Sequence, residues 1–191
     1  MFEFDEKVIE PGNFLIATPA LRDPNFHRSV ILICDHDAEG SFGLVVNRST
    51  QISVEQVLEE IDSDAESLHG VQFGGPVDHE RIFALRKGPL EGQDEREICP
   101  GVFIPEDLQR VIEQIRDGDE TLENYRFFLG YTGWGAGQLA EELDEKSWIV
   151  SAGTGIQLFE TPPDEMWSTA LRALGGEQIL WSLMPPEPDW N

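Results

Sequence analysis

The sequence predicts an α+β protein, with a single compact domain built on a mixed β-sheet flanked by about four helices. Short apolar runs outnumber the segments with helical periodicity, and the two kinds of segment do not alternate strictly along the chain. The length of 191 residues and the hydrophobic content of 40% suffice for one buried core, so a charged content of 26% does not here indicate disorder.

Each expected strand is a short run rich in Val, Ile, Leu or Phe that has turn residues at its ends. The polar segment 35–41 between the second and third runs suits a hairpin loop, and the acidic segment 88–97 is expected to be a loop as well. In chain order the expected strands are 13–18, 29–34, 42–47, 71–73, 81–86, 102–104, 126–131, 148–151 and 156–159.

The first two expected helices have clear start and stop signals. Ser53 and Gln56 form a capping box, and the apolar residues that follow repeat at helical spacing as far as Ile61. Pro105 opens the second helix, and Gly118 stops it after an apolar face of about three turns.

The last two expected helices lie in the C-terminal third of the chain. The segment 138–144 follows the glycine-rich turn 130–137 and carries two leucines one helical turn apart. The final helix has Thr161 as its cap and Pro162 at its first position, and it ends at Gly175.

One domain is expected over 1–184, followed by a mobile proline-rich tail over 185–191. No run of about 18 apolar residues predicts a transmembrane helix, and 1–10 lacks the basic and apolar regions of a secretory signal. Two cysteines, Cys34 and Cys99, are too few for a disulfide scaffold. We therefore expect a cytoplasmic protein with free thiols and no membrane association.

The charge balance excludes one large class of function. The chain has 37 Asp and Glu against 13 Lys and Arg, which gives a formal net charge of −24. Direct nucleic-acid binding needs clustered basic residues that neutralise phosphates, so none is expected. The acidity itself is typical of a solvated, self-repelling surface, and adaptation to high salt is an alternative cause.

Several segments, in order along the chain, resemble the AlgH-like family of bacterial proteins, also called YqgE-like. They are the run from Gly12 to Arg48, FGGPV at 73–77, CPGVF at 99–103, FLGYTGWGAGQL at 128–139 and the segment 159–175. The resemblance implies a single α+β unit around a mixed sheet. It also implies a regulatory role, which has been proposed for one member of the family without an established mechanism.

One candidate binding site is a polar cluster at a sheet end. In a hairpin of the second and third strands, the start of one lies beside the end of the other, which would gather Arg28, Ser29, Asn47 and Arg48 at one end of the sheet. Asn25 belongs to the same polar cluster. Two guanidinium groups there could bind a carboxylate or phosphate, so an unknown protein or a small anionic ligand is the expected partner. The alternative is that Arg28 and Arg48 pair with the protein's own carboxylates.

A second candidate is the glycine-rich turn at 130–137, together with Gly75. A strand, glycines and a helix N-terminus are the ingredients of an anion site, and Tyr131 and Trp134 would add contact surface. Neither of the phosphate-binding patterns G-x-x-x-x-G-K-[ST] and G-x-G-x-x-G is present. The alternative is therefore a structural turn that places Trp134 on the core.

A third candidate is Cys34, which lies two residues before His36 and so on the same face if the strand continues. A Cys–His pair would support a thiol-dependent enzyme or a redox-responsive protein, whereas a buried, inert thiol is the alternative. The segment 35–40 begins like a calcium loop, but the twelfth position is Val46 in place of the required Glu.

The sequence thus favours a cytoplasmic regulatory or interaction protein that acts through protein or small-ligand contacts. No coherent acid–base pair, cofactor motif or metal-ligand spacing is found, so no catalytic residue, cofactor or metal is assigned. The alternative function, from another class, is thiol chemistry at Cys34.

Overall fold

The computed structural model describes residues 9–58, 70–89 and 95–185, and it contains nine strands and six α-helices in these ranges. The strands are β1 Asn13–Ala17, β2 Val30–Asp37, β3 Gly40–Val45, β4 Gln72–Phe73, β5 Val77–Lys87, β6 Glu95–Cys99, β7 Val102–Pro105, β8 Tyr125–Gly135 and β9 Trp148–Ala152. The helices are α1 Val54–Val57, α2 Leu108–Asp117, α3 Gln138–Asp144, α4 Gly155–Glu160, α5 Pro163–Leu174 and α6 Gln178–Ser182, with a 3₁₀ turn at Leu122–Asn124.

The strands form one continuous sheet in the order β6-β7-β5-β8-β3-β2-β1-β9, with β4 paired to β8 beside this path. All pairs are antiparallel except β4 with β8, so the sheet is mixed. The predicted α+β class with a mixed sheet in a single compact domain is confirmed. None of the helices in the described ranges has the length and apolar character needed to cross a membrane.

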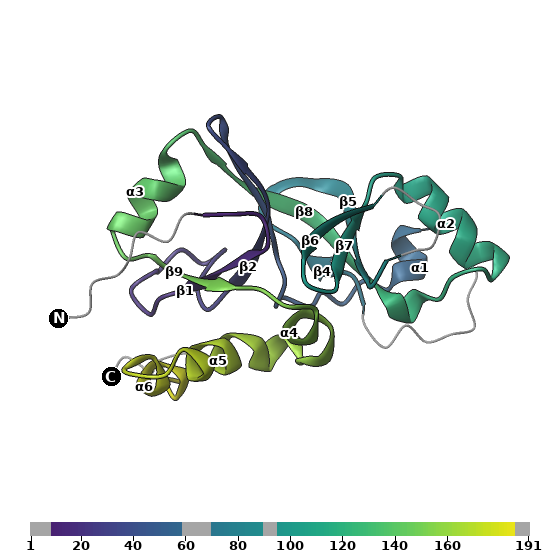
Figure 1. Cartoon of the computed structure of the whole chain (residues 1–191). Helices are drawn as coiled ribbons and strands as arrows, with labels where there is room; N and C mark the ends of the chain where they lie inside the picture. Colours follow the sequence, from purple (N-terminus) through teal and green to yellow (C-terminus); the bar gives the residue numbers. More distant parts are fainter. Residues whose placement is uncertain (1–8, 59–69, 90–94, 186–191) are drawn as a thin grey trace.

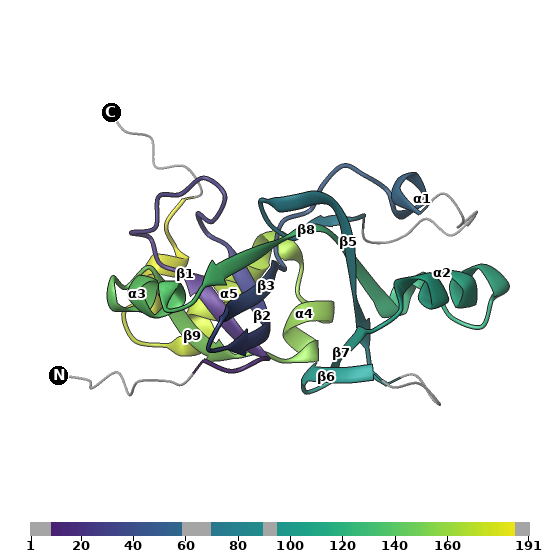
Figure 2. The same ribbon diagram turned by 90° about the horizontal axis from the view of Figure 1, so that it is seen from above.

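The core divides along the sheet (Figures 1 and 2). One face of β1, β2 and β3 packs on α5 through residues such as Met166 and Trp167. The opposite face packs on α3 through Leu139. The far end of the sheet, formed by β5 and β8, packs on α2 and α1 in a third cluster that includes Val54 and Val111.

Gly74 and Gly75 allow the chain to cross over strand β8. Val45 N–H donates to the Gly74 carbonyl, and Gly74 N–H donates to that of Leu129, so the crossing segment starts between β3 and β8. A Cβ on Gly74 would lie 2.2 Å from the Gly130 oxygen. Glycine is required here because two backbones touch, and β5 then pairs with the other edge of β8.

Most predicted elements are present, but β2, β5 and β8 are longer than predicted, and β6 was not predicted. The expected loop at 35–41 is mostly strand, because β2 and β3 continue to a tight turn after Asp37. The expected turn at 130–137 is largely the end of β8, which runs to Gly135. The predicted acidic loop at 88–97 includes the start of β6 from Glu95 onwards.

The helix prediction was wrong in number and in one assignment. The segment 156–159 was predicted as a strand but belongs to α4, which begins after the capping residue Thr154. Helix α6 was not predicted, so six helices replace the expected four. Helices α2 and α5 begin later than predicted, after Asp107 and Pro162, respectively. The Ser53 capping box is confirmed.

Ile61 and residues 186–191 of the expected tail lie outside the described residues.

Candidate functional site

Three neighbouring strands meet at one corner of the sheet with their side chains in register. From β2 through β3 to β8, the paired residues form three rows: Asp37–Gly40–Gly135, His36–Ser41–Trp134 and Asp35–Phe42–Gly133. Because successive residues of a strand point to opposite faces, the first and third rows share one face and the middle row lies on the other.

We call the face with the two outer rows the glycine face; it comprises Asp35, Asp37, Gly40, Phe42, Gly133 and Gly135. A Cβ placed on Gly135 would meet nothing within 4 Å, and one on Gly133 would meet only ordinary contacts of 3.5 Å or more. The part of this face on β8 is therefore open, because two alternate residues of the strand, Gly133 and Gly135, have no side chain. At the other end of the rows are the two carboxylates.

Aromatic rings form one side of the glycine face. Phe42 packs against Tyr131 and Phe83 with ring centroids 5.3 Å and 5.2 Å away, respectively. The Arg81 guanidinium lies 5.0 Å from the centroid of Phe83, which is a cation–π distance. A Cβ on Gly133 would lie 3.5 Å from the Tyr131 ring. The face thus combines aromatic surface, open backbone and negative charge.

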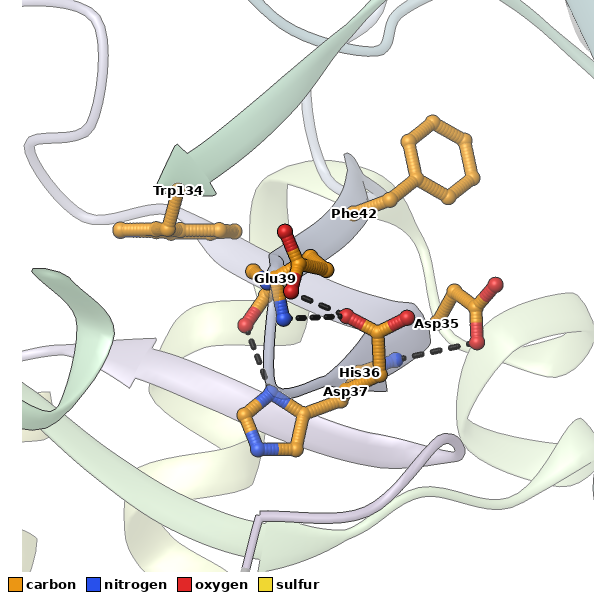
Figure 3. A pocket seen from close by; sticks show the side chains of 8 residues that line it. Asp35, His36, Asp37, Glu39, Phe42 and Trp134 are labelled. Atoms are coloured by element: carbon orange, nitrogen blue, oxygen red, sulfur yellow. Dashed lines mark hydrogen bonds between the residues drawn. The ribbon is translucent and has the colours of Figure 1, made fainter. Parts of the chain in front are cut away.

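A pocket of about 280 Å³ opens at this corner, lined by Glu39 of the turn and by residues of the three rows (Figure 3). The turn is held by Asp37, whose Oδ1 accepts the N–H groups of Glu39 and Gly40 at 2.8 Å and 3.1 Å. Asp35 faces Arg96 at 3.4 Å, with both side chains about half exposed, so this ion pair contributes little. The pocket is negatively charged.

The middle row faces α3. His36 Nδ1 and Ser41 Oγ are 2.7 Å apart and share a hydrogen bond. This pair has the residue types of a nucleophile and its base, but the nearby N–H groups of Glu39 and Gly40 donate to Asp37 and so do not form an oxyanion site. Among the described residues, no cluster of three or more His, Cys, Asp or Glu can hold a metal ion.

Trp134, a predicted contact residue, is almost completely buried on the α3 side of the sheet. Its indole N–H donates to Glu142 Oε2 at 3.0 Å, and the indole of Trp148 donates to the same oxygen at 2.7 Å. Gln138 donates to the other oxygen of Glu142. Trp134 therefore connects α3 to β8, and only part of it reaches the pocket.

The predicted polar cluster is assembled at the other end of β3. Arg48 donates to the carbonyls of Pro24 and His27, both at 3.0 Å. Asn47 accepts the N–H of Val30 and donates to the carbonyl of Arg28. These contacts attach the 23–29 segment, which includes Asn25, to the sheet.

Arg28 adopts a positive φ of 56° and holds the C-terminal helices in place. Its guanidinium stacks 4.1 Å from the Trp167 ring centroid and donates to the Met184 carbonyl at 2.7 Å. Burial lowers the pKa of Arg28, and it also lowers the pKa of Arg48 against the opposing effect of Asp23. Both guanidinium groups use donors on main-chain carbonyls of this protein.

The structure separates the predicted site residues into two groups. Trp134 pairs with Ser41, six residues before Asn47, which corresponds to roughly 20 Å of extended chain. Gly75 and Tyr131 meet at the strand crossing, where a Cβ on Gly75 would lie 2.2 Å from the Tyr131 carbonyl. Phe42, Gly133 and the carboxylates were not predicted as a group. If the two strands had been predicted to continue, the alternation of Gly40 with Phe42 and of Gly133 with Gly135 would have placed these residues on one face.

Cys34 is fully buried in the core, with its thiol 3.6 Å from the Leu32 carbonyl. His36 hydrogen-bonds to Ser41, so each side chain of the expected pair has a different partner. Burial raises the pKa of the Cys34 thiol to about 12 and that of Cys99 to about 11. Both groups are therefore thiols at neutral pH.

We expect neither cysteine to react with an aromatic disulfide reagent at pH 8 in the folded protein. With a pKa of about 12, Cys34 has a thiolate fraction of about one in ten thousand at this pH. Labelling of both thiols should require denaturant, and stopped-flow absorbance would measure it. Rapid labelling of Cys34 alone in native buffer would instead support the thiol function.

A family model described as AlgH-like matches residues 14–179 of this chain. The UPF0301 protein of Cytophaga hutchinsonii is 36% identical over 96% of this chain and 100% of its own length. That of Chlorobaculum tepidum is 35% identical over 97% of each. The chain also resembles the solution structure of the AlgH protein from Pseudomonas aeruginosa, with a TM-score of 0.72, 31% identity and coverage of 98% and 100%.

A crystal structure of a Corynebacterium diphtheriae protein superimposes on this chain with a TM-score of 0.80. The identity is 22%, and the match covers 94% of this chain and 95% of that one. This likeness establishes the fold alone.

Proposed function

This chain belongs to the AlgH-like family, and on that premise we propose that it is a regulatory interaction protein of the cytoplasm that binds a cationic segment of a partner protein. The proposed contact surface is the glycine face with the adjoining acidic pocket. One observation carries the proposal: carboxylates, aromatic rings and side-chain-free backbone coincide on one face at the end of three strands.

The charge of this corner favours a cation. Asp35, Asp37 and Glu39 project into or beside the pocket, and the whole chain carries a net charge of −24. Such a field attracts basic partners and speeds their encounter, and it repels nucleic acid. The proposal therefore assigns regulation to protein contacts and includes no direct grip on DNA.

The aromatic rings favour a lysine or arginine side chain in particular. A guanidinium over the face of an aromatic ring contributes about 0.5–2 kcal/mol, depending on its desolvation. The protein already holds Arg81 over Phe83 in this way, and Phe42 lies 5.2 Å from the same ring. An incoming cation can thus contact Phe42 and a carboxylate at once.

A small anionic ligand at Arg28 and Arg48, the hypothesis from the sequence, has less support. Both guanidinium groups already donate to carbonyls, and Arg28 is also stacked on Trp167. An anion would have to replace contacts that attach the 23–29 segment and the C-terminal helices. The cationic partner requires no such rearrangement.

The test is a charge reversal with a matched control. Glu39→Lys places a positive charge in the pocket, whereas Glu113→Lys makes the same change on an exposed position of α2. A fluorescent peptide containing two arginines should bind the native protein and Glu113→Lys alike, and Glu39→Lys should bind it at least about tenfold more weakly. Fluorescence anisotropy at 150 mM salt measures this.

Equal weakening by the two substitutions would mean that the peptide senses only the net charge, and the proposed site would then be wrong. A low-salt DNA-binding assay on the native protein is the complementary measurement. Micromolar or tighter affinity for DNA would contradict the proposal that the protein acts without contacting nucleic acid.

A further inference from the structure

We propose that the partner binds as an added β-strand along the open edge of β8 at Gly133, with basic residues at alternate positions. This inference rests on the proposed function, because it names the way in which the cationic segment reaches the same face. Strand addition supplies affinity through main-chain hydrogen bonds and specificity through alternate side chains.

The edge of β8 is open above the strand crossing. On one side, Thr132 to Gly135 pair with β3. On the other side, the pairing of β5 begins at Val77 with Tyr131 and runs towards lower numbers on β8. Within the described strands, 132–135 therefore has no partner on this second side. This edge is open because the chain crosses β8 at Gly75, so that the pairing of β5 begins only at Tyr131.

The direction of one N–H group identifies which residues face this edge. Gly135 N–H donates to Gln138 Oε1 at 3.1 Å and not to β3. Residues two apart in a strand direct their N–H and C=O groups to the same side, so those of Gly133 also point away from β3. Gly133 thus offers one donor and one acceptor to an incoming strand, which would replace Gln138 as the partner of the Gly135 N–H.

The cross-strand rows predict which side chains of the partner are basic. A partner residue beside Gly133 extends the row of Phe42 and Asp35, and a residue two positions away extends the row of Gly135, Gly40 and Asp37. Strands are about 4.8 Å apart, so β3 lies about 10 Å from the added strand. A long basic side chain can lie across the glycine and end over Phe42 or beside the pocket.

The residue between these two points to the opposite face, next to the buried Trp134. The recognised segment is therefore basic–x–basic in extended conformation. Two adjacent arginines would place one cation on the wrong face. The order of residues, at constant composition, is accordingly the property to test.

Three short peptides test the inference on the native protein. The first contains Arg-Thr-Arg between threonines, the second has the same composition with adjacent arginines, and the third is the first with N-methyl groups along one edge. We expect the first to bind about tenfold or more tightly than either of the others. Hydrogen exchange of the Gly133 amide should slow only with the first.

Equal affinity of the N-methylated and unmethylated peptides would overturn strand addition. If Glu39→Lys still weakened the binding of both peptides, the acidic pocket would stand as the binding site and only strand addition would fail. If no peptide bound more weakly to Glu39→Lys than to Glu113→Lys, the proposed function would fail as well.

A substitution in the protein gives an independent check. Gly133→Val adds a side chain in the row of Phe42, and its Cβ has room because the nearest atom is 3.5 Å away at Tyr131. The variant should keep the thermal stability of the native protein and lose at least about tenfold in affinity for Arg-Thr-Arg. Unchanged affinity in a folded Gly133→Val would contradict the inference.

Discussion

Replacing Gly75 with alanine is expected to leave the chain largely unable to fold. A Cβ at this position would lie 2.2 Å from both the carbonyl carbon and oxygen of Tyr131 and 2.5 Å from Thr132 N. These are backbone atoms of a central strand, which cannot move away as a flexible side chain can. Gly75 also has a φ of 155°, in the region that favours glycine.

We expect Gly75→Ala to lose more than about 4 kcal/mol of unfolding free energy, a large part of the stability of an ordinary domain. Gly135→Ala is the matched control, because its Cβ would meet nothing within 4 Å and its φ is not positive. It should change stability by less than about 1 kcal/mol. Urea denaturation followed by circular dichroism measures both, and similar stabilities for the two variants would refute the backbone crossing.

Replacing Glu142 with alanine is expected to give the second-largest loss of stability. Its carboxylate accepts hydrogen bonds from the indoles of Trp134 and Trp148, which are 6% and 4% exposed, and from the side chain of Gln138. Removal leaves two nearly buried N–H donors without their acceptor. Each unsatisfied buried donor costs about 1–3 kcal/mol.

The expected loss for Glu142→Ala is therefore about 2–6 kcal/mol, measured as a lower midpoint of urea unfolding. Glu141→Ala is the control, since Glu141 is the exposed neighbour on the same helix. The near-ultraviolet circular dichroism of the tryptophans should also weaken in Glu142→Ala. Equal stability of the two alanine variants would mean that the shared carboxylate does not hold α3 on the sheet.

The sequence predicts the class of fold well because the apolar runs are long enough to identify strands. It fails at 156–159, where four residues of IQLF are too few to distinguish a strand from a helical turn. The cap at Thr154 determines the outcome, and Gln157 N–H donates to its side chain. Strand ends were also missed, because polar and glycine residues continue a strand wherever its neighbours provide hydrogen bonds.

The candidate site could be predicted only in part for the same reason. Trp134 stands out in the sequence as an aromatic residue in a glycine-rich segment, and Gly75 as one of two adjacent glycines. The residues that contact them, however, lie on other strands. The alignment of Asp35 with Phe42 and Gly133 depends on two registers, one of which includes an irregularity between Ile33 and Asp35. A single sequence does not determine such registers, because a shift of one residue reverses every face.

We expect a cationic segment of a partner protein to bind on the glycine face. The most direct measurement is a titration of isotopically labelled native protein with the Arg-Thr-Arg peptide, followed through amide chemical shifts. We expect saturable shifts concentrated at Asp35, Asp37, Gly133 and Gly135, with the amides of α2 unchanged. Shifts spread evenly over the acidic surface, or centred on Arg28 and Arg48, would contradict it.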